Sequence, residues 1–156
     1  MEGRIYERSI ETAIGRLLLR ADKAGVVEIR FGAAEPRTDA ADVLLRAECE
    51  LREYFAGMRR QFSVPLHPSG TDFQLRVWNA LKEIPYGETV SYGELAKRIG
   101  NPKTARAVGM ANHCNPIPVI VPCHRVIGAN GRLTGYAGGL DVKQKLLELE
   151  RGYVKI

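Results

Sequence analysis

The feature that most constrains the fold is a change in the spacing of the apolar residues, which falls across residues 57–70. Before it, apolar and polar side chains alternate over three short runs, at residues 4–10, 16–21 and 26–31. Such alternation is typical of strands with one buried face, and the short connections between the runs favour antiparallel pairing. We therefore expect a small antiparallel meander.

A helix is expected at residues 39–55, because apolar residues recur there near helical spacing. A glycine follows it as a stop signal, and residues 57–70 contain prolines and glycines without a sustained period, which is typical of a linker. We predict a first domain at residues 1–66, a linker at 67–72 and a second domain at 73–156.

Beyond the linker, the sequence contains signals for three helix starts. Thr71 and Gln74 form a capping box that predicts a helix over residues 72–84. Ser91 and Glu94 form a second box and start a shorter helix. The second domain is therefore expected to be mainly helical.

The shorter helix is expected to end at Gly100, and Asn101 followed by Pro102 predicts a new helix over residues 102–113. Helix, glycine-containing turn and helix form the helix-turn-helix pattern, in which the second helix contacts DNA. An ordinary helical hairpin would give the same pattern, so both interpretations stay open at this point.

The second helix of this pair is nearly free of bulky side chains. Its small residues are Ala105, Ala107, Gly109 and Ala111, and its long cations are Lys103 and Arg106. A slim helix allows its backbone to approach DNA, although small residues equally suit packing against another helix. Only together with the cations does this composition favour DNA.

The net charge of +5 is unevenly distributed along the chain. Residues 1–72 contain 11 Lys and Arg against 12 Asp and Glu, which leaves 12 against 6 for residues 73–156, or −1 and +6. A basic second half suggests an anionic partner such as nucleic acid, although such a charge is also common on solvated surfaces.

The chain has neither a membrane-spanning apolar stretch nor a secretory leader, so we expect a soluble, cytoplasmic protein, associated with the nucleoid when bound to DNA. Its three cysteines are Cys49, Cys114 and Cys123. An odd number without a leader argues against a disulfide framework. Free thiols are therefore available for chemistry.

Of the three cysteines, Cys123 has the neighbouring residues most typical of an activated thiol. Residues 119–121 are expected to form a short buried strand, and Pro122 suits the first position of a helical turn, which places Cys123 at a helix start. Backbone N–H groups there favour a thiolate, and His124 and Arg125 add donors or positive charge. The alternative is a buried structural cysteine.

A second alternative combines His113 and Cys114 with Cys123 and His124 as four zinc ligands. Structural zinc sites usually leave two to four residues between paired ligands, whereas these pairs are adjacent. The spacing argues against the metal.

Several segments together resemble the methylated-DNA-protein-cysteine methyltransferases, the O6-alkylguanine-DNA alkyltransferases. The similar segments are Gly100 to Lys103, Ala105 to Gly109, Asn115 to Pro118, Pro122 to Val126 and Gly135 to Gly139. Their order and separations match over residues 73–152, while the first domain is similar only in length and layout.

The resemblance implies that Cys123 accepts the alkyl group. It also implies that His124 draws the thiol proton through a water molecule and that Glu150 orients the imidazole. From the residues alone, His124 could bind backbone and Glu150 could be a solvated charge at a helix end.

Further roles follow from the same resemblance. Asn115 would tie the helix-turn-helix to the active-site strand, Tyr92 would donate a proton to N3 of the leaving guanine, and Arg106 would replace the extruded nucleotide in the duplex. The alternatives are a turn residue, a core aromatic and a surface cation, respectively. Lys103, Ala105, Gly109 and Arg125 complete the expected DNA contacts.

The base pocket is expected to contain Pro118, Val126, Tyr136 and Ala137. Ala137 stands where some relatives have serine, which removes one side-chain donor and puts the range of substrates in question. The first domain lacks the Cys and His cluster that binds zinc in some relatives, so we expect neither zinc nor any cofactor.

The expected fold class is α/β or α+β, with a small ribonuclease-H-like antiparallel sheet plus helix and a C-terminal winged helix-turn-helix. The implied function is direct, stoichiometric and irreversible repair of O6-alkylguanine, and of O4-alkylthymine as an open question, in double-stranded DNA by a monomer. One rival is a non-enzymatic protein that binds alkylated bases; the members of this superfamily that do so have tryptophan at the position of Cys123. Another is a transcription regulator, for which the chain has no separate sensor segment.

Overall fold

The computed structural model describes residues 4–32 and 35–152, so the predicted outer limits of the two domains lie outside the described residues. The chain divides into two compact units between Ser69 and Gly70. None of the described helices is both long enough and apolar enough to cross a membrane.

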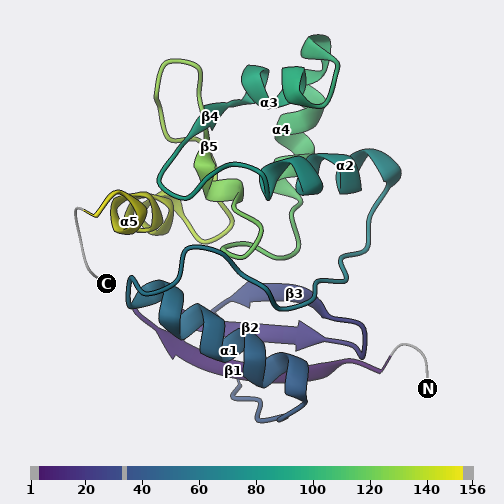
Figure 1. Ribbon diagram of the computed structural model, residues 1–156, viewed down its shortest axis with the longest axis vertical. Helices are drawn as coiled ribbons and strands as arrows, with labels where there is room; N and C mark the ends of the chain where they lie inside the picture. Colours follow the sequence, from purple (N-terminus) through teal and green to yellow (C-terminus); the bar gives the residue numbers. More distant parts are fainter. Residues whose placement is uncertain (1–3, 33–34, 153–156) are drawn as a thin grey trace. The chain divides into compact units, whose positions relative to one another are not determined.

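The first unit contains the predicted meander, which is confirmed. Strands β1 (Tyr6–Thr12), β2 (Gly15–Ala21) and β3 (Val26–Phe31) form an antiparallel sheet in that order. Helix α1 (Asp42–Phe55) lies across one face of it (Figure 1). The core between them is apolar, and its fully buried side chains include Leu17, Leu19, Leu44, Ala47 and Leu51.

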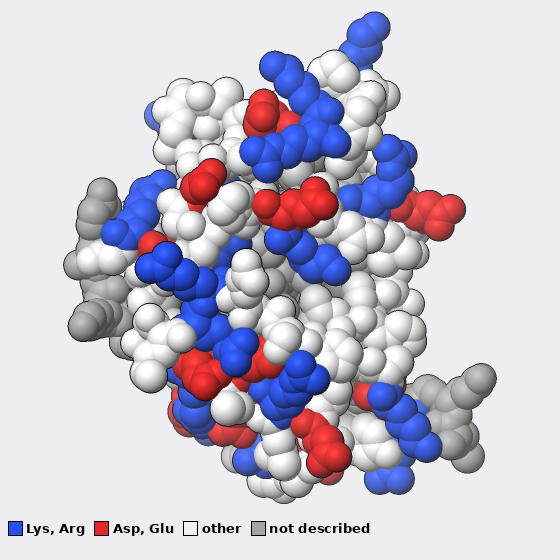
Figure 2. Space-filling view, viewed as in Figure 1, with Lys and Arg blue, Asp and Glu red and all other residues white. Residues whose placement is uncertain are grey.

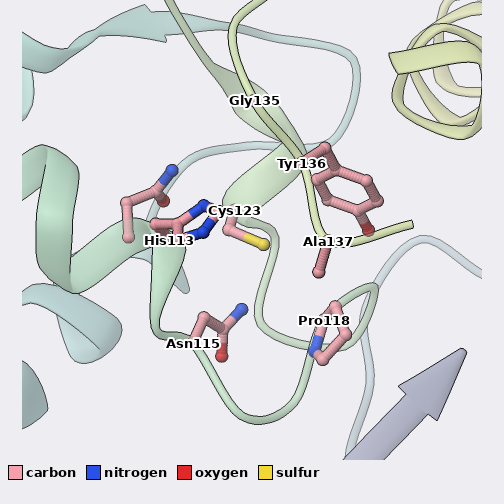
Figure 3. Close-up of a pocket in the computed structure, with 8 residues that line it drawn as sticks. His113, Asn115, Pro118, Cys123, Gly135, Tyr136 and Ala137 are labelled. Carbon is pink, nitrogen blue, oxygen red and sulfur yellow. The ribbon is translucent and has the colours of Figure 1, made fainter. Parts of the chain in front are cut away.

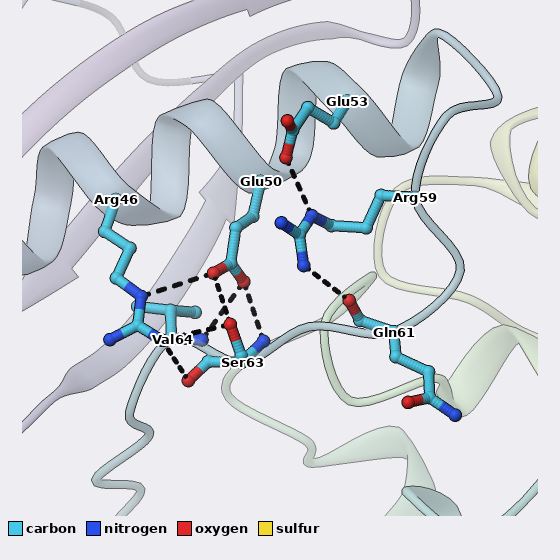
Figure 4. Close-up of polar contacts among 7 residues, drawn as sticks. All are labelled: Arg46, Glu50, Glu53, Arg59, Gln61, Ser63 and Val64. Atoms are coloured by element: carbon cyan, nitrogen blue, oxygen red, sulfur yellow. Dashed lines mark hydrogen bonds and ion pairs between the residues drawn. The ribbon is translucent and has the colours of Figure 1, made fainter.

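The buried carboxylate of Glu50 fixes the segment that follows α1. Glu50 accepts hydrogen bonds from the backbone N–H groups of Ser63 and Val64, at 2.8 and 3.0 Å, and Arg46 lies 3.3 Å from it (Figure 4). Burial alone would raise the pKa of Glu50, but the hydrogen bonds from Ser63 and Val64 outweigh it and lower that pKa. The segment then passes so close to Gly25 that a Cβ there would lie 2.5 Å from the carbonyl oxygen of Pro65.

The second unit is mainly helical, as expected. The capping box of Thr71 and Gln74 forms and starts α2 (Asp72–Leu81), which ends three residues before the predicted limit. Ser91 accepts from the N–H of Glu94 and caps α3 (Tyr92–Arg98). The predicted third helix begins as a 3-10 turn, Pro102–Thr104, and continues as α4 (Ala105–His113).

Two long-range contacts hold these helices around the site. The indole N–H of Trp78 in α2 donates to the carbonyl oxygen of Ala111 in α4 at 2.8 Å. Strand β4 (Val90–Ser91) pairs in parallel with β5 (Val126–Ile127). The chain then reaches α5 (Leu140–Arg151), where Gly152 adopts a left-handed conformation at φ 79° and ends the helix.

Two predictions for the segment before the thiol are wrong. Residues 119–121 are buried as expected but form a turn, in which Val119 has a φ of 73°. Pro122 precedes the next helical turn instead of occupying its first position. A β-branched residue at positive φ is rare and costs energy, so tertiary contacts must hold this turn in place.

Candidate functional site

Cys123 opens a single 3-10 turn, Cys123–Arg125, and lines a narrow pocket. The other lining residues come from the end of α4, the buried turn and the loop before α5; they are Asn112, His113, Asn115, Pro118, Gly135, Tyr136 and Ala137. The sulfur points toward the space bordered by Pro118, Tyr136 and Ala137 (Figure 3). That space is about the size of one water molecule, so a nucleobase requires the walls to move.

The prediction that a helix start lowers the pKa of Cys123 is wrong for the resting protein. Burial raises the pKa of this thiol to about 11, although Asn115, Lys143 and the local backbone oppose the shift. The turn is a single one, and the N–H of Cys123 itself donates to the carbonyl oxygen of Val121. The resting site therefore holds a protonated thiol.

Asn115 connects the end of α4 to the turn before Cys123. Its Nδ2 donates to the carbonyl oxygen of Val121 at 2.9 Å, and its Oδ1 accepts from the N–H of Ile117 at 3.0 Å. The side chain also hydrogen-bonds the Cys123 thiol, which favours the thiolate. Asn115 thus fixes the shape of the buried turn and the place of the sulfur together.

His124 and Glu150 form a buried pair across 26 positions of sequence. The distance from Nε2 of His124 to Oε2 of Glu150 is 2.6 Å. A carboxylate only accepts, so the imidazole proton lies on Nε2 and the lone pair lies on Nδ1. Nδ1 is buried and makes no hydrogen bond to the described residues, and burial lowers the pKa of His124 while Glu150 opposes the shift.

Arg125 is a correction, because it was expected to contact DNA. It is 6% exposed, and its Nε and Nη2 lie 2.8 and 3.0 Å from the two carboxylate oxygens of Glu150. Nη1 donates to the carbonyl oxygen of Ile84 at 2.7 Å. Burial would raise the pKa of Glu150, but His124 and Arg125 hold it well below its usual value. Arg125 therefore keeps Glu150 ionised and in place.

Lys143 is a buried residue whose charge acts on Cys123, and it was not singled out from the sequence. It is fully buried, and its ammonium donates to the carbonyl oxygens of Val126 and Thr134, at 2.7 and 3.2 Å. Burial lowers the pKa of Lys143, and the Cys123 thiolate would raise it. Lys143 lies seven residues before Glu150, and this spacing places both residues on one face of a helix. That spacing was the signal in the sequence from which its place near Glu150 could have been predicted.

Tyr92 begins α3, and its hydroxyl is hydrogen-bonded to the side chain of Thr134. Gly109 of α4 lies beside its ring, where a Cβ would be 3.6 Å away. The small residue in α4 therefore faces Tyr92. The structure does not place Tyr92 among the residues that line the pocket.

The 3-10 turn before α4 and the first turn of α4 present the expected cations to solvent. Lys103 and Arg106 are both exposed, and Ala105 is half-buried between them. Met110 follows Arg106 by one helical turn and is 65% exposed, which sequence reasoning did not single out. A slim helix with one cation and one flexible apolar side chain suits insertion into a DNA groove.

Three of the four residues expected in the base pocket line the pocket that the structure contains. Pro118, Tyr136 and Ala137 line it, but Val126 is fully buried in β5 and does not. The carbonyl oxygen of Val126 instead accepts from Lys143. Burial and the charge of Glu150 raise the pKa of Tyr136, as a Cys123 thiolate would, so this hydroxyl stays neutral.

The four-ligand zinc alternative does not fit the structure. His113 and Cys114 are exposed, whereas Cys123 and His124 are buried. Within residues 4–32 and 35–152, no three His, Cys, Asp or Glu side chains are grouped so that they could hold a metal ion.

Two family models match the chain. The model described as the DNA-binding domain of 6-O-methylguanine DNA methyltransferase matches residues 72–152, and the one described as its ribonuclease-like domain matches residues 5–68. Together they span both units.

Individual relatives are similar over nearly the full length. The methylated-DNA–protein-cysteine methyltransferase of Methanosarcina acetivorans is 54% identical over 153 residues, 94% of this chain and 98% of the relative. The crystal structure of the Mycobacterium tuberculosis O6-methylguanine methyltransferase has a TM-score of 0.87 and 48% identity, covering 97% of this chain and 95% of that one. A structure described as Mycobacterium tuberculosis OGT in complex with DNA gives a TM-score of 0.87 and 50% identity, covering 95% and 94%.

Proposed function

The chain belongs to the 6-O-methylguanine DNA methyltransferase family, and on that premise we propose that Cys123 is the residue that accepts the alkyl group. The protein repairs alkylated guanine in DNA by transferring the group to a cysteine. The first question is therefore which of its three cysteines reacts.

The single observation that selects Cys123 is its place in a pocket next to the buried pair of His124 and Glu150. Cys49 and Cys114 are exposed and do not line this pocket. A thiol needs a base to become a nucleophile, and a base needs a partner that fixes its tautomer. Cys123 directly precedes His124 in the chain, so it is the thiol to which we assign both.

The imidazole of His124 is the proposed base. Glu150 accepts the proton on Nε2, which leaves Nδ1 with a lone pair, and the lowered pKa of His124 keeps the ring neutral and able to take a proton. A water molecule would relay the thiol proton to Nδ1. The positive charge of Lys143 would then stabilise the thiolate.

The proposed reaction is an in-line displacement at the alkyl carbon. The sulfur of Cys123 forms a bond to that carbon while the bond to guanine O6 breaks, and Tyr92 gives a proton to N3 of the leaving guanine. The thioether has no easy route back, so one molecule repairs one base. No cofactor enters this balance.

The proposed partner is double-stranded DNA from which the damaged base is extruded, since a stacked guanine cannot reach a recessed thiol. A relative has been crystallised with DNA, and both Lys103 in the 3-10 turn before α4 and Arg106 in the first turn of α4 are exposed. Arg106 would occupy the place of the extruded nucleotide. Lys103, Ala105 and Gly109 would lie along the duplex, and the protein would act as a monomer.

The test is to mix the protein with duplex DNA containing O6-methylguanine and to map methylated peptides by mass spectrometry. We expect one added methyl group, on the peptide that contains Cys123. Cys123→Ala should bind DNA without accepting the group, while Cys114→Ala, the control, should react normally. Methyl on Cys49 or Cys114 would place the chemistry elsewhere.

The same experiment distinguishes an alkyl-transferring protein from the non-enzymatic alternative. Protein that binds the damaged duplex but stays unmodified with excess substrate would be a recognition protein. Repeating the assay with O4-methylthymine and with bulkier O6 adducts would define the range that the Ala137 wall accepts.

A further inference from the structure

The hydroxyl groups of Tyr92 and Thr134 are hydrogen-bonded to each other across 42 positions of sequence. Thr134 directly precedes Gly135 and Tyr136, which line the pocket. Its carbonyl oxygen accepts from the buried ammonium of Lys143 at 3.2 Å. Thr134 therefore joins the start of α3 to the pocket wall and to the lysine beside Cys123.

We propose that Thr134 is a positioning residue for the transfer reaction, which orients the Tyr92 hydroxyl so that its proton is available to the leaving guanine. This inference rests on the roles proposed above for Cys123 and Tyr92. It goes beyond them by assigning a function to a residue outside the Cys-His-Glu group.

The argument begins with the hydrogen-bond capacity of the two groups. Each hydroxyl has one hydrogen and accepts through its lone pairs, and the hydrogen rotates to suit its surroundings. When Thr134 donates to the oxygen of Tyr92, the phenolic hydrogen must point elsewhere and can reach the base. When Tyr92 donates to Thr134, that proton is not available. A substrate acceptor at N3 selects the first arrangement.

The movement of electrons and protons during the transfer step indicates when Thr134 acts. The electron pair of the breaking carbon–oxygen bond moves onto guanine, which takes the Tyr92 proton at N3, so a phenolate forms as the sulfur–carbon bond closes. The Thr134 hydroxyl then donates to the phenolate oxygen, and such charge-assisted hydrogen bonds are the stronger kind. The proton that Cys123 gave to His124 returns to Tyr92 through solvent.

The surroundings of Thr134 favour this role over that of a simple loop contact. Lys143 donates to two carbonyl oxygens, of Val126 at 2.7 Å and of Thr134, and so fixes the backbone of the loop next to β5. Gly109 leaves space beside the ring of Tyr92. A fixed hydroxyl beside a fixed ring is what positioning requires.

The experiment measures single-turnover transfer from a duplex containing O6-methylguanine, with DNA affinity measured separately. Thr134→Val keeps the shape and removes the hydroxyl, and Thr134→Ser restores it. We expect Thr134→Val to slow transfer about tenfold at unchanged affinity, below the range of a complete general acid, and Thr134→Ser to stay near wild type. Thr12→Val, which removes a hydroxyl in the other unit bonded to Gly15, is the matched control.

Two further measurements separate positioning from a structural role. In a Tyr92→Phe background the Thr134→Val change should have no further effect, because the proton donor is already gone. With 3-deaza-O6-methylguanine, which has no N3 to protonate, Thr134→Val and wild type should react equally. An equal loss in both backgrounds, or no loss at all, would overturn the inference. Failure of wild type to methylate Cys123 would instead overturn the proposed function.

Discussion

Burial controls the chemistry of Cys123 as much as its neighbours do. The sequence suggested a thiol activated by a helix start, but the structure has a protonated thiol in a pocket with room for about one water molecule. A buried thiol with a raised pKa resists unwanted reagents, since only the thiolate is nucleophilic. In the mechanism proposed above, His124 would activate the thiol at the moment of reaction.

The raised pKa predicts how Cys123 reacts with a small neutral alkylating reagent such as iodoacetamide. Below a pKa of about 11 the thiolate fraction rises with pH, by about tenfold per unit. Labelling of the Cys123 peptide, followed by mass spectrometry without DNA, should therefore keep rising from about pH 8 to pH 10. A plateau already reached near neutral pH would mean that the resting site holds a thiolate.

The contacts of Arg125 predict a loss of stability rather than of DNA affinity when it is removed. Arg125→Met leaves the buried carboxylate of Glu150 without its guanidinium partner, and breaking such a pair costs about 3 kcal/mol. Urea unfolding should show this loss. Arg106→Met, at an exposed position, should change stability by less than about 0.5 kcal/mol. An Arg125 variant with full stability and weakened DNA binding would restore the original prediction of a DNA contact.

At the scale of elements, α3 and α4 combine the two tasks of the second unit. One side of α4 packs at Gly109 against the ring of Tyr92, while Arg106 in its first turn and Lys103 in the 3-10 turn before it are exposed to solvent. Of the small residues that the sequence left open between packing and DNA approach, Gly109 is explained by packing against Tyr92. In the function proposed above, the exposed start of the same helix would contact the duplex.

The place of Arg106 predicts an effect that depends on the substrate. Extruding a base costs a few kcal/mol, so Arg106→Ala should slow transfer from duplex DNA by about tenfold or more. Free O6-alkylguanine base needs no extrusion and should react at the wild-type rate. Rapid-quench transfer assays on both substrates would check this, with Lys103→Ala as the control that weakens affinity alone. Equal slowing on both substrates would show that Arg106 supports the pocket instead.

At the scale of the whole molecule, charge is a weaker guide than the sequence suggested. The difference between −1 for residues 1–72 and +6 for residues 73–156 describes the chain, not its surface. On the face seen in Figure 2, Lys and Arg side chains lie interspersed with Asp and Glu. Arg125 and Lys143 are buried, so two of the cations in the basic half cannot meet phosphate.

The cations that are not buried should make the affinity for DNA depend on salt concentration. Affinity for undamaged duplex should fall linearly with the logarithm of salt concentration, because phosphate contacts release counterions. Lys103→Ala should reduce the slope by about 1, as expected for one lost phosphate contact. Fluorescence anisotropy at several salt concentrations would measure both. A slope of zero would exclude a phosphate-binding surface.

Signals that act over a few residues made much of the fold predictable. Alternation identified the three strands, and the caps at Thr71 and Ser91 identified two helix starts, because each hydrogen bond joins residues three apart. The same local reasoning failed at residues 119–121, where apolar β-branched residues suggested a strand. The turn found there is held by Asn115 and by burial.

The amino-acid sequence by itself determined most of the elements, the family resemblance and the identity of the candidate thiol. Tertiary structure alone decided that the thiol is protonated at rest, that Arg125 is buried against Glu150, and that the buried ammonium of Lys143 contacts Thr134 next to the pocket wall. The physical reason is that a pKa and a hydrogen bond depend on what lies around a group. Here those neighbours come from segments 9 to 42 positions away, which no local pattern encodes.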